Sequence, residues 1–369
     1  MSKIYFKTND GFTLIELLAV IVILAIILLI AIPVVLGVVE ESRLNAFKIN
    51  SLMLFKAIEQ ESIIALTNGV EINIENLNIS NMKDKIGIDS TNYSYIEATK
   101  FNDHIQLYIE GANAWGGYVF HGNEKEYLYG KKTPESCFVF NEAIGDIEDY
   151  LIENRGCTEN VVIPSQINGI DVVSIEANNF WRAFNYYGIK SVIIPHTVTY
   201  IGAGAFQRNE IELLFFTNSL EHLGEYAFTE NNIPGIFIPN SVTTMQTGVF
   251  MHNNISKISI PIEFTEIPRR FLHDNSITEI EISSNITAIF QDGLSDNLLT
   301  KIRIPSTVLT LDYQSLRDNN LSTIIMEGSG TTVHGYALND SNTHFRDTYL
   351  SNGAGTYVGT QMGTWTKVD

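Results

Sequence analysis

The sequence is poor in basic residues, cysteine and proline, and each shortage excludes a class of protein. Its 369 residues include only 23 Lys and Arg against 42 Asp and Glu, so the formal net charge is −19. A surface that binds phosphate needs clustered basic side chains, so we expect no nucleic acid partner. Two cysteines are too few for a disulfide-dense scaffold or a Cys-rich zinc site, and nine prolines without a low-complexity tract argue against disorder.

Catalytic and cofactor-binding motifs are also absent from the sequence. It contains no GxSxG, HExxH, Walker A or Cys-x-x-Cys pattern, and no loop with EF-hand spacing. His104 and His121 have no acidic residues at metal-ligand spacing, which predicts ordinary surface or half-buried positions for both. We therefore expect no enzymatic activity, no catalytic residue, no cofactor and no metal site. Weak calcium binding by neighbouring carboxylates stays open.

One segment of the chain is far more apolar than the rest. Charged residues make up only 18% of the sequence, and residues 17–39 form a run of 23 positions without a charge. About 20 residues of helix cross a bilayer core, so this run is long enough to span a membrane. Lys3 and Lys7 precede it, and the positive-inside rule then places the short N-terminus in the cytoplasm and the remainder outside. The pattern predicts a single-pass membrane protein, and an ordinary signal anchor or a cleaved signal peptide would share it.

A carboxylate beside the apolar run indicates a more specific class. A charge within a membrane helix costs about 2.5–3.5 kcal/mol at the helix centre, and the run supplies no cation for Glu16. The residues GFTLIE, from Gly11 to Glu16, resemble the processing site of type IV prepilins. The resemblance implies that prepilin peptidase removes a leader of residues 1–11 and that Phe12 becomes the methylated N-terminus. It also implies that Glu16 pairs with the terminal amine of a neighbouring pilin subunit, and that Pro33 kinks the helix as in pilins.

The helix is expected to continue beyond the membrane and to lead into a small sheet. An apolar stripe at three- and four-residue spacing predicts one helix over residues 12–69, of which 14–39 are transmembrane. The stripe consists of Leu44, Phe47, Leu54, Phe55 and Ile58. Apolar and polar residues alternate at 70–74 and again at 105–109, with Gly-rich turns further on. Residues 70–136 are therefore predicted to form a small pilin-like β head.

Two cysteines lie where this head is expected to end. Cys137 and Cys157 are separated by 20 residues and would meet oxidising conditions after export. A disulfide between them would stabilise the fold by about 3 kcal/mol in the chain-entropy model. Two unpaired thiols are the alternative, and the sequence leaves both open.

From Ile189 onward the sequence repeats with a period of 22 residues. Each repeat has an Asn at the same position, a strand-like apolar set after it, and a bulky apolar residue that is expected to point inward. The asparagines are Asn209, Asn231, Asn253, Asn275, Asn297 and Asn319. One such coil cannot fold alone, so stacked coils with one parallel strand each are expected to bury a continuous core. The Asn side chains are expected to form a ladder that hydrogen-bonds buried turn backbone, with ligand binding as the alternative role.

Two stretches of the repeat, SVIIPHTVTYIGAGAFQRN and IFIPNSVTTMQTGVFMHNN, resemble the BspA-like class of leucine-rich repeat. The Ala-Phe pair before the ladder Asn, as in Ala205-Phe206, is typical of that class, and later repeats replace it with other residues. The resemblance implies a leucine-rich-repeat solenoid over residues 137–340, with a longer first coil as its N-terminal cap. The Gly/Thr-rich residues 341–369 are expected to close it as a hairpin or C-terminal cap.

The two resemblances together define the expected fold and function. We expect a multidomain protein in which a long N-terminal pilin α-helix and a small α+β head precede a leucine-rich-repeat β-solenoid of 22-residue coils. It would be a minor or tip subunit of a type IV pilus that displays the solenoid at the cell surface for adhesion. Its partners would be prepilin peptidase, other pilin subunits, the membrane and a surface ligand, protein or glycan, that the sequence does not identify. The alternatives are a pseudopilin of a type II-like secretion or DNA-uptake system, and a membrane-anchored exported enzyme.

Overall fold

The structure is a computed structural model of the whole chain. It describes residues 14–67, 91–101, 104–154, 156–176, 183–338, 343–360 and 363–369. The chain divides into two compact units, residues 1–50 and residues 51–369, and each is described by itself.

Helix α1 runs from Leu14 to Thr67, 54 residues or about 80 Å, and has Pro33 inside it. Its stretch Ile21–Gln60 is long and apolar enough to cross a membrane by length and composition. The predicted long N-terminal helix is therefore confirmed over the described residues, whereas Phe12 and the predicted C-terminal stop at Asn68 lie outside them.

Four antiparallel strands follow in the second unit and form what we call the head sheet. They are β1 (Tyr93–Phe101), β2 (His104–Gly111), β3 (Tyr118–Gly122) and β4 (Tyr127–Lys131), in the order β1-β2-β3-β4. One face of the sheet is apolar and buried, with Ile96, Leu107 and Phe120 as examples. The predicted small antiparallel sheet is confirmed, and the predicted alternation at 70–74 lies outside the described residues.

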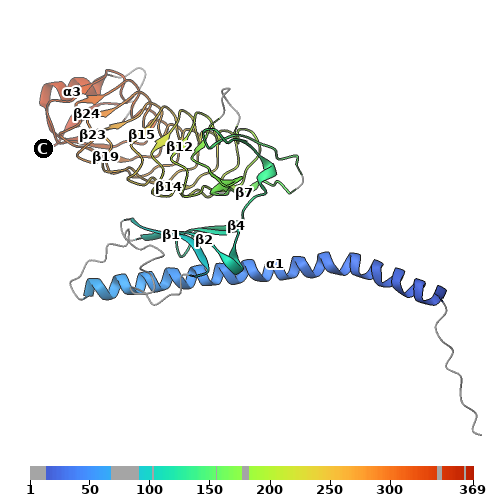
Figure 1. Cartoon of the computed structure of the whole chain (residues 1–369). Helices are drawn as coiled ribbons and strands as arrows, with labels where there is room; N and C mark the ends of the chain where they lie inside the picture. Colours follow the sequence, from blue (N-terminus) through green and yellow to red (C-terminus); the bar gives the residue numbers. More distant parts are fainter. Residues whose placement is uncertain are drawn as a thin grey trace, which may run out of the picture. The chain divides into compact units, whose positions relative to one another are not determined.

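The remaining chain winds into a stack of short coils, the solenoid, which runs from right to left in Figure 1 and closes at helix α3 (His344–Asn352). Strands of successive coils pair in parallel with an offset of 22 residues, as in Ile236 with Ile258 and Ile302 with Ile324. This offset confirms the predicted solenoid. The strands of this first set are β7 (Asn160–Val162), β11 (Ser191–Ile193), β14 (Gly235–Phe237), β16 (Lys257–Ser259), β19 (Lys301–Ile304) and β21 (Thr323–Met326).

Most coils also carry a second strand of two residues, which the sequence pattern does not predict. These strands are β10 (Ser174–Ile175), β12 (Tyr200–Ile201), β13 (His222–Leu223), β15 (Thr244–Met245), β17 (Glu266–Ile267), β18 (Ala288–Ile289), β20 (Thr310–Leu311) and β22 (Thr332–Val333). Two residues are too short to give a period-2 pattern in the sequence. The first set is also interrupted, since the described stretch 277–287 has no strand.

Each end of the solenoid is closed by antiparallel structure. At the N-terminal end, β5 (Phe138–Asn141) pairs with β6 (Asp146–Tyr150), and β8 (Gln166–Ile167) pairs with β9 (Ile170–Asp171). At the C-terminal end, β23 (Gly355–Gly359) and β24 (Trp365–Lys367) form a hairpin that continues from β21. Helix α3 (His344–Asn352) precedes it and has no counterpart among the predicted elements, because its one buried pair, Phe345 and Tyr349, is too short a pattern to predict a helix.

A column of phenylalanines forms the centre of the solenoid. The rings of Phe184, Phe206, Phe228 and Phe250 stack from coil to coil at centroid distances of 4.8, 5.2 and 5.8 Å. All four are fully buried. The inward position of each repeat therefore supplies the continuous core that a single coil could not bury.

Candidate functional site: the junction of the head sheet and the solenoid

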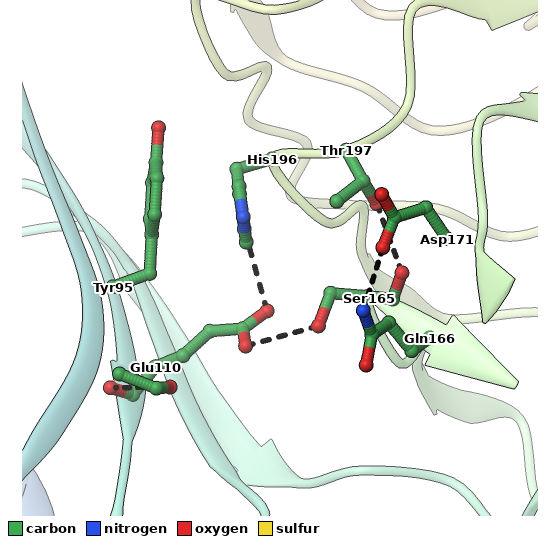
Figure 2. A pocket seen from close by; sticks show the side chains of 8 residues that line it. Tyr95, Glu110, Ser165, Gln166, Asp171, His196 and Thr197 are labelled. Carbon is green, nitrogen blue, oxygen red and sulfur yellow. Dashed lines mark hydrogen bonds and ion pairs between the residues drawn. The ribbon is translucent and has the colours of Figure 1, made fainter. Parts of the chain in front are cut away.

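The head sheet and the first coils of the solenoid line an open polar cavity of about 190 Å³. Figure 2 shows Glu110 of the head sheet with His196 and Ser165 of the solenoid pointing toward one another. Tyr95 also lines the cavity, and its ring stacks on the imidazole of His196 at 3.5 Å with 12° between the planes.

Glu110 is the buried charge at the centre of this junction. Its Oε1 accepts a hydrogen bond of 2.6 Å from the Tyr108 hydroxyl and lies 3.5 Å from Nδ1 of His196. Its Oε2 accepts from Lys132 Nζ at 3.0 Å and from the Ser165 hydroxyl at 3.1 Å. Burial alone would raise the pKa of Glu110, but the contacts with His196, Lys132 and Tyr108 outweigh it and hold the pKa at about 2.

A second polar anchor lies further along strand β1. The backbone N–H of Asn218 donates to Oε1 of Glu97 at 2.7 Å, and its side-chain Nδ2 donates to the Thr99 hydroxyl at 2.7 Å. Because Asn218 belongs to the solenoid, these two bonds fix the far end of the head sheet to it.

Apolar contacts fill the space between the two anchors. Tyr108 and Val119 of the head sheet form one buried cluster with Val162 and Ile193 of the solenoid. His121 lies beside this cluster, 5.3 Å from the ring of Phe215 between centroids.

The prediction of a surface or half-buried position for His121 is wrong. Its side chain is 2% exposed, because the solenoid covers the face of β3 that the sequence pattern leaves to solvent. Burial lowers the pKa of His121 to about 3. The side chain of His104, about which the same prediction was made, lies outside the described part of the chain.

The junction brings a serine, a histidine and a glutamate together, but not in a catalytic order. A triad needs a serine that donates to an imidazole, which is in turn oriented by a carboxylate. Here Ser165 donates to Glu110 itself, and an ionised carboxylate with a pKa of about 2 is a weak base. The arrangement therefore fits a joint between two parts of the fold rather than a reactive centre.

The residues that form this joint are difficult to predict from the sequence. Glu97 and Glu110 alternate with apolar residues along their strands, which is typical of a solvent-facing side. The solenoid offers no clear signal either, because the position of Ile193 and Phe215 is also apolar in later coils, at Phe237 and Ile325.

The predicted Asn ladder residues all occupy the same place in successive coils. Each Nδ2 donates to a carbonyl oxygen 25 residues earlier at 2.7–3.0 Å, and each Oδ1 accepts from an N–H 20 residues earlier at 2.9–3.2 Å. All six are buried. Their amide groups are engaged by backbone, which leaves them little capacity for a ligand.

The other predicted site residues lie near the N-terminus and at the start of the solenoid. Cys137 and Cys157 are joined by a disulfide, with 5.7 Å between their Cα atoms, and Cys137 is part of the solenoid core. Glu16 and Pro33 lie within α1. Gly11 and Phe12 lie outside the described residues.

Comparison with known families identifies the two parts of the chain. The "BspA type Leucine rich repeat region" matches in six copies, over residues 145–275, 181–299 and 249–345, and so covers more than half of the chain. The "Prokaryotic N-terminal methylation motif" matches residues 6–32. The chain therefore belongs to the BspA-type leucine-rich-repeat proteins, and it carries the N-terminal methylation motif of prepilins ahead of the repeats. Neither family is catalytic.

Solved structures of leucine-rich-repeat proteins resemble the chain distantly. A leucine rich cell surface protein of Faecalibacterium prausnitzii is 21% identical, with a TM-score of 0.40 over 69% of this chain and 59% of its own. A leucine-rich-repeat protein of Bacteroides ovatus is 15% identical, with a TM-score of 0.33 over 64% of this chain and 65% of its own. The chain thus spans about three fifths of the length of these proteins. No curated protein matches it in sequence.

Proposed function

We propose that the protein is a minor or tip pilin-like subunit of a type IV pilus that displays its solenoid for adhesion at the cell surface. The observation that carries the proposal is the presence on one chain of a prepilin methylation motif, a long apolar helix and a leucine-rich-repeat solenoid. The motif implies processing by prepilin peptidase. A subunit with so large a head packs poorly along a whole fibre, which favours a minor or tip position.

In this proposal each segment has one role. Residues 1–11 are the leader, 12–69 the assembly helix, 70–136 the head, 137–340 the solenoid with its N-terminal cap, and 341–369 the C-terminal cap. After cleavage, the new amine at Phe12 is methylated and Glu16 pairs with the amine of a neighbouring subunit. Pro33 bends the helix within the filament.

The junction supports a display role because it fastens the solenoid to the head sheet at two separate anchors. The Glu110 network and the bonds from Asn218 lie at opposite ends of the contact, so the solenoid is held in one orientation. A net charge of −19 favours a neutral or basic ligand, protein or glycan, over an acidic one.

The processing step is tested by Gly11→Ala in cells that contain the peptidase. We expect the variant to keep the mobility of the precursor, whereas Gly37→Ala, a matched control, is processed, since a Cβ at Gly37 meets nothing within 4 Å. Processing of Gly11→Ala at the wild-type rate would contradict the proposal.

The assembly and adhesion steps need separate readouts. Immunogold labelling is expected to find the protein sparsely on purified pili, and Glu16→Ala is expected to remove it from them. A glycan and matrix-protein screen with these pili is expected to lose its signal when the protein is deleted. Labelling at major-subunit abundance would refute the minor or tip position, and absence from surface filaments would favour a pseudopilin.

A further inference from the structure

The contact between the head sheet and the solenoid contains a buried imidazole that the anchors do not use. His121 lies on β3, with Tyr108 and Leu128 opposite it on the neighbouring strands. The ring of Tyr108 meets it edge-on at 5.2 Å, and Phe215 of the solenoid packs on its other side at 5.3 Å. Within the part of the chain that the structure describes, its Nδ1 has no hydrogen-bond partner.

A second buried polar group on the same face of the sheet is also unsatisfied. Gln106 is 8% exposed, and its Oε1 has no hydrogen-bond partner among the described residues. Buried polar groups without partners lower the stability of the contact that covers them, because each is better solvated when the contact opens. A permanent interface would place apolar side chains at His121 and Gln106, as it does at Val119.

We propose that the contact between the head sheet and the first coils is a seam that acid opens, with His121 as the group that takes up a proton when the seam parts. In the closed seam the imidazole is neutral and packs on Phe215. In the open seam it reaches water and binds a proton there. The two parts stay linked through the chain between β4 and β5, so opening frees the orientation of the solenoid without releasing it.

The direction of the pH effect follows from the two states of the imidazole. Its pKa is about 3 in the closed seam, against an ordinary value of 6.5 when exposed. Between these values the open form binds more protons than the closed form, so a fall in pH favours opening. A single group with these pKa values shifts the opening equilibrium about 25-fold between pH 7 and pH 5.

The other titratable groups that face the seam do not reverse this direction. Glu110 stays ionised down to a pH of about 2, and burial raises the pKa of Tyr108 well above its usual value. Oε1 of Glu97 accepts from the backbone N–H of Asn218 at 2.7 Å. His196 also faces the seam, with its Nδ1 3.5 Å from Oε1 of Glu110, and therefore needs its own variant.

The test is hydrogen–deuterium exchange on the full-length processed protein in detergent micelles at pH 7, 6 and 5. The amide of Val162, which donates to the Thr133 hydroxyl, and the amide of Asn218 report on the seam. The amide of Phe228, which donates to Val249, reports on the solenoid core. We expect the protection factors at Val162 and Asn218 to fall about 25-fold from pH 7 to pH 5 while that at Phe228 stays constant.

Three variants separate His121 from the other groups. His121→Leu is expected to remove the pH dependence of seam protection, and His121→Phe, which keeps a ring against Phe215, serves if the Leu variant does not fold. His196→Gln, at the other imidazole of the seam, and the exposed His334→Gln are both expected to keep the fall. Constant seam protection in the wild type between pH 7 and pH 5, or an equal fall in both His121 variants, would overturn the proposal. These outcomes do not depend on whether the protein enters a pilus.

Discussion

The side chain of Asn253 joins its coil to the one before it, since its Nδ2 donates to the carbonyl oxygen of Phe228 at 2.9 Å. Its Oδ1 accepts at the same time from the N–H of Ile233 at 3.2 Å. One amide therefore satisfies two buried backbone groups of the preceding coil, and the pattern recurs in every ladder residue. The ladder stabilises the stacking of coils where neither strand set supplies hydrogen bonds.

Replacement of Asn253 by Leu should destabilise the solenoid. Leu has a similar volume but leaves the buried N–H of Ile233 unsatisfied, and the carbonyl of Phe228 keeps only its bond from Asn231 Nδ2 at 3.1 Å. The unsatisfied N–H costs about 1–3 kcal/mol. Urea unfolding followed by circular dichroism measures the loss. Asn254→Leu is the matched control, because the neighbouring Asn254 is exposed. Equal midpoints for the Asn253 variant and the wild type would show that the ladder bonds contribute nothing.

Glu110→Gln should lower the free energy of unfolding, and the loss should be largest at neutral pH. The pKa of Glu110 is lowered from 4.5 to about 2, so its contribution is complete above pH 4.5 and is lost as the pH falls toward 2. The shift corresponds to about 3 kcal/mol at pH 7. Thermal unfolding between pH 3 and pH 7 is expected to show a smaller pH dependence in the variant. Glu126→Gln, at an exposed turn, provides the comparison, and a variant curve parallel to the wild type would contradict the assigned role.

The solenoid could be predicted from the sequence because its signal is repeated. A single Asn or Phe carries no information on fold, but the same residue at one position of six coils shows that the coils share one geometry. The inward positions were predicted correctly for the same reason. The second strand set escaped prediction, because two residues such as Tyr200 and Ile201 carry no period of their own.

The junction could not be predicted, because its burial depends on residues far apart in the chain. Glu97 and Glu110 have the alternation of a sheet with one face in water. Their partners Asn218 and Ser165 lie 121 and 55 residues further on, and no local pattern links them. A polar face that is satisfied by another part of the fold looks, in the sequence, like a polar face in solvent.

The disulfide offers a prediction that is independent of the repeat. A bridge that closes the 20-residue separation between Cys137 and Cys157 should contribute about 3 kcal/mol in the chain-entropy model. We expect no free thiol in the denatured, unreduced protein and two after reduction, with a lower unfolding midpoint. The double variant with Ser at both positions should have the unfolding midpoint of the reduced protein, and reductant should not change it. Two thiols before reduction would show that the bridge does not form.

Backbone conformation at the corners of the solenoid leads to the last prediction. Two positions in each coil have a positive φ, and at one of them, from Arg208 at 57° to Asp318 at 49°, no residue is Gly. A positive φ strains the backbone of an L-residue with a Cβ but not that of Gly. Asp318→Gly should therefore raise the free energy of unfolding by about 1 kcal/mol. The exposed ion pair of Asp318 with Arg317, at 3.1 Å, is worth too little to offset this gain. Asp318→Ala is the control, since it loses the same ion pair but keeps the strained φ and should not be stabilised. If urea unfolding shows the Gly variant to be no more stable than the Ala variant, the corner is not strained.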